Sequence, residues 1–447
     1  MSSLDNIISI SITRETQSVT QQGFGTFGII AEFSTSKTTV TFDRSRTYAS
    51  LSEMATDGWA VGDEVYDAAA LVFSQNPKIS NILVGRKDSG DASWSAALEE
   101  VQDSSTEWYT FIIIASQAST TTFDADFITS NSIDFTINET AVTTVPFNTD
   151  NATTYADIKT QIEADIANST VSIDAVARTV IVEIFGEQVS TVSVTVTGGA
   201  SQATGTTVYV NEDDYKAAAA WAETQTKIYF YADSSAAIYD GASTTDIAYF
   251  MQNQNYDRTV SIYHAAAQGD ATPSWIESAW PGECLPYDVG EQTWSYKTLS
   301  GVAAYDLTSA RRTAILGKNC NIYTTTAGVA TTEEGKVASG EWIDIIRGVD
   351  ALRASIQEEI FANNLVNPRK TPYTDDGINA IIGILLKVLN DYAADGFLIA
   401  DSITVTYPEY ADVSSIDKTN RVLSDIEFEA SPQGAIHTMT IAGTISL

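Results

Sequence analysis

Hydrophobic and polar residues follow two different periods along the chain. Residues 81–86 and 108–116 are short, almost wholly apolar runs, which are typical of strands buried on both faces of a sheet. Residues 63–75 instead repeat apolar positions at helical spacing and end before a proline, which indicates an amphipathic helix. Further helical segments alternate with apolar runs at 227–232 and 258–264. This order predicts an α/β fold with a mixed or parallel sheet covered by helices on both faces.

The pattern changes between residues 119 and 210, where the chain becomes rich in threonine. Strict two-residue alternation predicts strands at residues 133–137, 180–184 and 192–196. One amphipathic helix, at 155–166, interrupts them. Without this stretch, strand 111–115 would lead directly to helix 214–223. We therefore predict an inserted, β-rich α+β domain in a connection between a strand and a helix.

The last third of the chain predicts two long helices, at residues 342–360 and 378–392. Thr374 is placed to begin the second helix and Gly396 to end it. Strands are predicted to follow at residues 403–407, 426–429 and 435–447.

One-faced strands are predicted at both ends of the chain. An exposed edge strand is a liability in a monomer, but pairing with a neighbouring chain by β-augmentation would satisfy its main-chain groups. The candidate exchange residues are Ile8, Ile10, Ile12, Ile436, His437, Met439, Ile441 and Ile445. The candidate receiving strands carry Ile403, Val405, Ile426 and Phe428. The alternative is that both ends complete a sheet of their own chain.

Charge restricts the partners of the protein. The 447 residues include 24 Lys and Arg against 58 Asp and Glu, a formal net charge of -34. Nucleic-acid binding draws on cationic side chains, so neither nucleic acid nor an anionic membrane surface is an expected partner. The longest apolar run, residues 378–388, is too short to span a membrane. Two distant cysteines and the lack of a secretory signal at the start lead us to expect a protein made in a reducing cytoplasm.

The search for chemical motifs predicts no catalytic, cofactor-binding or metal-ligating residues. Gly23, Gly25 and Gly28 form a literal G-x-G-x-x-G, but the dinucleotide fingerprint needs a helix next, and residues 29–33 predict an extended segment. His264 and His437 lie in or beside predicted strands, for which structural roles are expected. The adjacent carboxylates of Glu333 and Glu334 are expected to be solvated.

An ordered set of segments spans nearly the whole chain: YDAAALVF at 66–73, the NP pair at 76–77, ILVGR at 82–86, TWSYKTLSG at 293–301, NCNIY at 319–323, GEWID at 340–344 and AIHTMTIAG at 435–443. In this order the chain resembles the contractile phage tail sheath family, in particular a branch with a threonine-rich inserted domain. The resemblance implies a structural, non-enzymatic virion protein that needs no cofactor. Such subunits assemble in the host cytoplasm, polymerise around an inner tube, and contract to drive that tube through the host envelope. Implied partners are copies of itself, the tail tube protein, and the baseplate and tail terminator proteins.

Pattern and resemblance together predict six parts. These are an N-terminal arm (1–22), a first part of the sheath core (23–118), the inserted domain (119–210), a second part of the core (211–330), a C-terminal α/β sheath domain (331–434) and a C-terminal arm strand (435–447). Two other functions stay open. A secreted acidic β-rich adhesin or carbohydrate-binding protein would account for the threonine and aromatic content, and a nucleotide-binding oxidoreductase would use the glycine motif.

Overall fold

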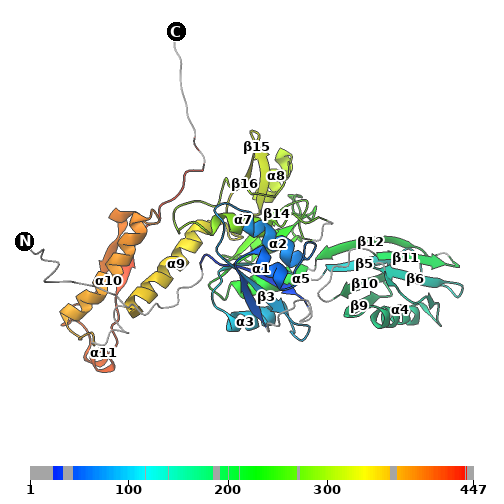
Figure 1. The fold of residues 1–447 in the computed structure, drawn as a ribbon, viewed down its shortest axis with the longest axis horizontal. Helices are drawn as coiled ribbons and strands as arrows, with labels where there is room; N and C mark the ends of the chain where they lie inside the picture. The colour runs from blue at the N-terminus through cyan, green and yellow to red at the C-terminus, as the bar shows by residue number, and fades with distance from the viewer. Residues whose placement is uncertain are drawn as a thin grey trace, which may run out of the picture. The chain divides into compact units, whose positions relative to one another are not determined.

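The computed structural model describes residues 24–33, 44–115, 117–138, 140–184, 192–199, 201–210, 212–268, 272–362, 370–437 and 439. The chain divides into two compact units (Figure 1). The core unit comprises the described residues within 23–288, 292–346 and 437–447. The described residues of the C-terminal unit are those within 347–436 together with Val289–Glu291.

An eight-stranded sheet forms the centre of the core unit, in the order β16-β15-β14-β13-β4-β1-β3-β2. Its strands are β1 (Phe27–Glu32), β2 (Ser45–Tyr48), β3 (Ile82–Lys87), β4 (Thr110–Ile114), β13 (Ile228–Asp233), β14 (Thr259–Tyr263), β15 (Asn321–Thr326) and β16 (Val329–Glu333). From β15 to β3 neighbouring strands are parallel, and β16 and β2 pair antiparallel at the two edges. The predicted α/β class with a mixed or parallel sheet is confirmed, and the sheet is mixed.

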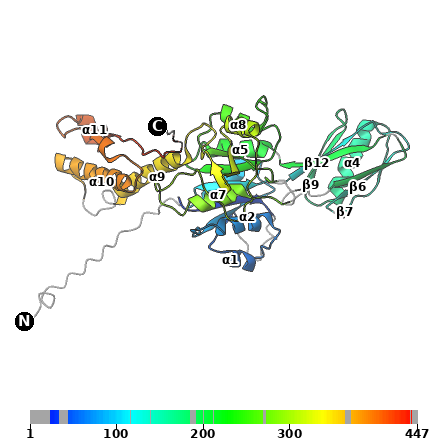
Figure 2. The ribbon, with the colours of Figure 1, turned by 90° about the horizontal axis from the view of Figure 1, so that it is seen from above.

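Both faces of this sheet are buried, as the continuous apolar runs predicted. In β4, Ile112 and Ile114 face one core while Phe111 and Ile113 face the other, because successive side chains of a strand point to opposite sides. The first core is covered by α1 (Leu51–Thr56), α2 (Glu64–Phe73) and α7 (Ile276–Cys284). The second is covered by α3 (Trp94–Ser104), α5 (Glu212–Ala222), α6 (Ile247–Asn253) and α8 (Ser309–Leu316). Figure 2 shows α1 and α2 on one side of the sheet and α5 and α8 on the other.

The glycine motif has a packing role. Gly28 lies within β1, so an extended segment follows the motif as predicted. A Cβ atom on Gly28 would lie 3.0 Å from the Trp108 ring and 3.3 Å from Cβ of Phe111. The Trp108 ring also stacks on Trp221, with ring centroids 5.8 Å apart. The glycine therefore lets aromatic side chains approach the backbone of β1.

The threonine-rich stretch forms sheets of its own. One has the order β12-β5-β10-β9 and the other β11-β6-β7, with β8 paired to β6. Its elements are β5 (Gln117–Phe123), β6 (Ser132–Ile137), β7 (Thr140–Ala141), β8 (Val145–Pro146), α4 (Asn151–Asp165), β9 (Ser169–Asp174), β10 (Thr179–Ile184), β11 (Val192–Thr197) and β12 (Ala203–Val210). They enclose a separate hydrophobic cluster that includes Phe135, Tyr155 and Val180. Its two ends meet, because Gln117 is the register partner of Val210.

The C-terminal unit is built on two helices. Its elements are most of α9 (Ile343–Ile360), then α10 (Asp375–Ala394), the 3₁₀ turn η3 (Ala400–Ser402), β17 (Thr404–Thr406), α11 (Ser415–Asn420) and β18 (Glu427–Glu429). Thr374 caps α10 by accepting a hydrogen bond from the Gly377 amide, and Gly396 follows the helix at φ +87°, both as predicted.

By length and composition alone, α10 is apolar enough to cross a membrane, although the sequence predicted only a shorter apolar run. Core helices of soluble proteins can have the same length and apolar composition. The apolar residues of α10 are partly accounted for by one buried face, which includes Ile378, Ile382, Leu385 and Leu389.

The closed ends of the insertion make it replaceable. Thr121 and Thr206 are register partners in β5 and β12, so a short Gly/Ser linker can join Thr120 to Thr207. We expect the shortened chain to remain soluble and to unfold in one cooperative thermal transition, measured by calorimetry. Aggregation or loss of that transition would mean that the core sheet needs the insertion to fold.

Candidate functional site

The strand order indicates at which edge of the central sheet a ligand would bind. The parallel strands β3-β1-β4-β13-β14 follow the doubly wound order, in which the chain reverses direction between β1 and β4. In such folds, ligands bind outside the carboxyl ends of the strands, near this reversal. A nucleotide or substrate site, if the protein had one, would be expected there.

Buried acidic side chains occupy this edge. Glu277, in the first turn of α7, is 3% exposed, and burial raises its pKa to about 7. Burial, together with the charges of Asp67 and Glu277, raises the pKa of Glu64 at the start of α2 to about 8. Burial, followed by the negative charges of Glu277, Asp233 and Glu64, also raises the pKa of Tyr215 well above its usual value. These side chains therefore cluster at one place and resist ionisation.

Such an edge is chemically unsuited to a phosphate. A phosphate site uses free helix N-terminal amides and cationic side chains. Here the first turns of α2, α5 and α7 each carry at least one acidic residue. Within the described residues, no three His, Cys, Asp or Glu side chains are arranged to hold a metal ion. The described part of the edge therefore carries acidic side chains with raised pKa values, beside the Lys87–Glu32 ion pair at the ends of β3 and β1.

The other chemical candidates have structural surroundings. The Ala266 amide donates to His264 Nδ1 at 3.1 Å, and the other ring nitrogen lies 2.9 Å from the Ala303 carbonyl oxygen. Both ring nitrogens are therefore held by the backbone. The prediction that Glu333 is solvated is wrong. Glu333 ends β16, is 7% exposed, and pairs with Arg312 at 2.5 Å. The charge of Arg312 compensates its burial.

The predicted receiving strands lie side by side. β17 and β18 pair antiparallel, with Val405 opposite Phe428. Ile403 and Ile426 each precede one of these strands. Among the described residues the pair forms a two-stranded sheet, so each strand has one paired and one outer edge. Phe428 is 41% exposed.

The predicted exchange residues are only partly described. Ile8, Ile10, Ile12, Ile441 and Ile445 lie outside the described residues. Ile436 is 84% and Met439 73% exposed, and neither belongs to a described strand. A terminal strand over residues 435–447 therefore stays a prediction beyond His437 and has no support at residues 435–437.

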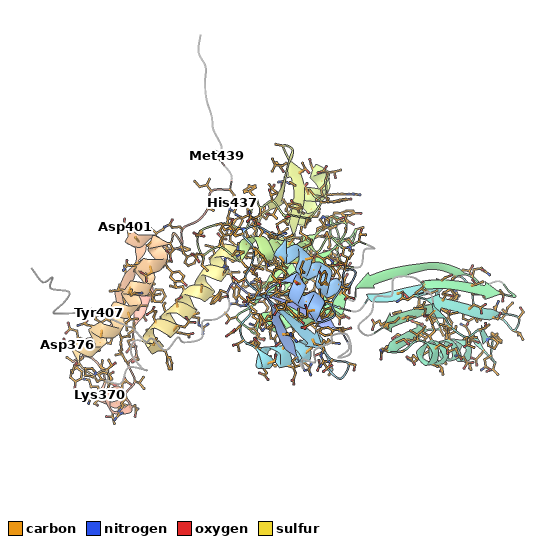
Figure 3. The ribbon with its side chains drawn as sticks, in the orientation of Figure 1. Lys370, Asp376, Asp401, Tyr407, His437 and Met439 are labelled. Carbon is orange, nitrogen blue, oxygen red and sulfur yellow. The ribbon has the colours of Figure 1, made fainter. Side chains whose placement is uncertain are left out.

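His437 has a site of its own, which sequence reasoning missed. Thr293 Oγ1 lies 2.9 Å from His437 Nε2, and Ser295 Oγ lies 3.5 Å from Nδ1. Tyr296 donates its hydroxyl to the His437 carbonyl oxygen at 3.0 Å. The imidazole stands edge-on to Trp342, with ring centroids 4.6 Å apart. We call Thr293, Ser295, Tyr296 and Trp342 the His437 socket. Figure 3 labels His437 and, two residues later, Met439.

The hydrogen bonds of the socket assign a proton to one of the imidazole nitrogens. Thr293 Oγ1 accepts from the Ser295 amide and also lies within hydrogen-bond distance of His437 Nε2. Ser295 Oγ donates to the Glu334 carbonyl oxygen, which leaves it as an acceptor toward Nδ1. Nδ1 of His437 is therefore assigned as a hydrogen-bond donor. No single motif marks this site, because its residues come from three distant parts of the sequence.

Searches against protein-family models and curated protein sequences returned no match for this chain.

The buried acids make stability depend on pH. Their folded-state pKa values are raised, so the stabilising contribution of their protonated forms is present in acid and is lost as pH rises through about 7 to 8. We expect the melting temperature to fall by several degrees between pH 5.5 and 8.5, and Glu277→Gln to reduce that fall. The exposed Glu107→Gln should not change it. Equal falls in Glu277→Gln and the parent protein would contradict the assignment.

The same acidic edge leads us to expect no nucleotide binding. Neither NAD nor ATP at millimolar concentration should raise the melting temperature in a fluorescence-detected thermal scan, since specific binding stabilises the native state by mass action. A reproducible, saturable rise would restore the oxidoreductase interpretation.

Proposed function

We propose that this protein is the structural sheath subunit of a contractile phage tail, which polymerises around an inner tube and contracts to drive it through the host envelope. It acts without catalysis or a cofactor. Its partners are other copies of the chain, the tube protein, and the baseplate and terminator proteins. It is built into the virion after assembly in the host cytoplasm.

The observation that carries this proposal is the surface of the C-terminal unit. Of the sixteen large hydrophobic side chains exposed among the described residues, ten belong to this one unit, which covers about a fifth of the chain. They are Val349, Phe361, Leu386, Ile399, Tyr407, Tyr410, Ile416, Val422, Phe428 and Ile436. Exposed apolar residues gathered in one part of a molecule are typical of protein interfaces.

The β17–β18 pair adds a second means of association. Its outer edges offer main-chain donors and acceptors to a further strand, and an arm from another copy would supply one. The acidic edge of the core sheet supports a role without nucleotide chemistry. The ordered resemblance to sheath proteins then favours a polymer over a simple dimer.

The net charge of the subunit should make its assembly depend on salt concentration. Copies with a net charge of -34 repel one another, and salt screens this repulsion over about 8–10 Å at 0.1–0.15 M. Cylinders should therefore form more readily as ionic strength rises, which negative-stain microscopy of the purified protein would show.

Two matched variants test the proposed interface. Ile416→Glu places a charge on a side chain in the C-terminal unit that is 68% exposed, and Val176→Glu does the same on an insertion residue that is 92% exposed. Both should leave the melting temperature within about a degree, because surface changes have little effect on stability. We expect Ile416→Glu to abolish cylinders and Val176→Glu to retain them.

If the parent protein stays monomeric at all salt and protein concentrations tried, the sheath proposal fails. If Ile416→Glu and Val176→Glu both assemble normally, this part of the C-terminal unit is not the interface. Binding of the monomer to a glycan array would instead favour the adhesin alternative.

A further inference from the structure

The His437 socket lies where the chain enters and leaves the C-terminal unit. Trp342 immediately precedes α9, which leads into that unit, and His437 is the first residue after it. Thr293 follows closely after Val289–Glu291, the other segment of the unit. All five residues of the contact belong to the core unit. The Trp342–His437 contact therefore closes residues 343–436 into a loop whose two ends are both fixed to the core unit.

We infer that the socket is a binding site for His437 that acts as a clasp, closing this loop and fixing the point from which the C-terminal arm leaves the core unit. The inference goes beyond the proposed function, since a clasp of this kind serves any protein with this loop. In the proposed sheath it would determine where the exchanged arm begins.

Among the described residues of the C-terminal segment, His437 makes the contacts with the socket. The neighbours Ile436 and Met439 are 84% and 73% exposed, so they add little burial. His437 contributes both nitrogens, its ring edge and its carbonyl oxygen. Removing this side chain should therefore release the whole segment, whereas changing an adjacent residue should not.

One residue of the socket, Tyr296, has a strained backbone conformation. Tyr296 adopts φ +59°, a left-handed conformation that is unfavourable for a bulky side chain. Its amide is held by the Thr332 carbonyl oxygen, and its hydroxyl reaches His437 O. Backbone strain of this kind persists where the surroundings enforce it, and it is concentrated at functional sites. Here the strained backbone presents the hydroxyl that holds the returning chain.

Histidine NMR of the full-length monomer tests the clasp directly. The chain has two histidines, so selective ¹⁵N labelling gives two imidazole systems, and His437→Ala assigns them. We expect His437 to carry a proton on Nδ1 and to show ring-proton shifts caused by Trp342. Thr293→Val, which removes the hydroxyl and keeps the shape, should change the His437 signals and leave those of His264 unchanged.

Mobility of the arm gives a second measurement. Cys284 and Cys320 are buried, so a fluorophore can be attached selectively through Met439→Cys. In the parent background the label should show high anisotropy. In His437→Ala it should lose this anisotropy and match the same label on a free peptide of residues 434–447. The neighbouring Ile436→Ala, with its exposed side chain, should have no effect.

The clasp would be refuted by a label equally mobile with and without His437, or by His437 signals identical to those of the free peptide. Because both measurements use the monomer, they do not depend on whether cylinders form. If the clasp is observed in monomers that never polymerise, the inference about His437 is supported and the sheath proposal fails.

Discussion

The double burial of the central sheet constrains where the rest of the chain can lie. Strands such as β4 place apolar side chains in two separate cores, so neither face has room for additional chain. Additional segments of chain can therefore be accommodated only at the ends of strands or at the edges of the sheet. The insertion follows this rule, because it begins just after the carboxyl end of β4 and returns to the start of α5. The C-terminal unit follows it as well, since its helix begins after the edge hairpin β15–β16.

The same burial decides which elements could be predicted from the sequence. β1, β3, β4, β13 and β14 were predictable because a strand buried on both faces is apolar throughout. The hairpin β15–β16 was missed because its residues, NIYTTT and VATTE, are mostly hydroxyl-bearing and resemble a loop. α7 was missed because Pro281 and Gly282 lie inside it. Its tight contact with α2 explains the glycine, since a Cβ on Gly282 would lie 3.0 Å from Cα of Val72.

For the functional candidates, the sequence indicated the residue types better than their surroundings. The pairing of Val405 with Phe428 was within reach, because two short strands near each other in the sequence commonly pair. The His437 socket could not be predicted, because alternation of apolar and polar residues says nothing about a partner 95 or more positions away. The prediction for Glu333 failed for the same reason, because the sequence did not show which side chain lies beside it. Its neighbouring glycine suggested a solvated loop, and only the structure shows that the Glu333 side chain is buried and pairs with the half-exposed Arg312.

A protein that consumes no nucleotide must draw any mechanical work from a difference between two packings of the same chains. Close-packed cores change little between such states, so the difference has to arise at joints and interfaces. In the proposed sheath, we expect this difference to arise at the surfaces of the subunits and where the chain passes between the two units, which includes residues 289–291 and the start of α9. Shifting a two-state equilibrium from 1:99 to 99:1 takes about 5.5 kcal/mol. Subunits coupled in a polymer share that requirement, so each can contribute a small part. The many exposed apolar side chains of the C-terminal unit suit this requirement, because each can make or lose a small contact without disturbing a buried core.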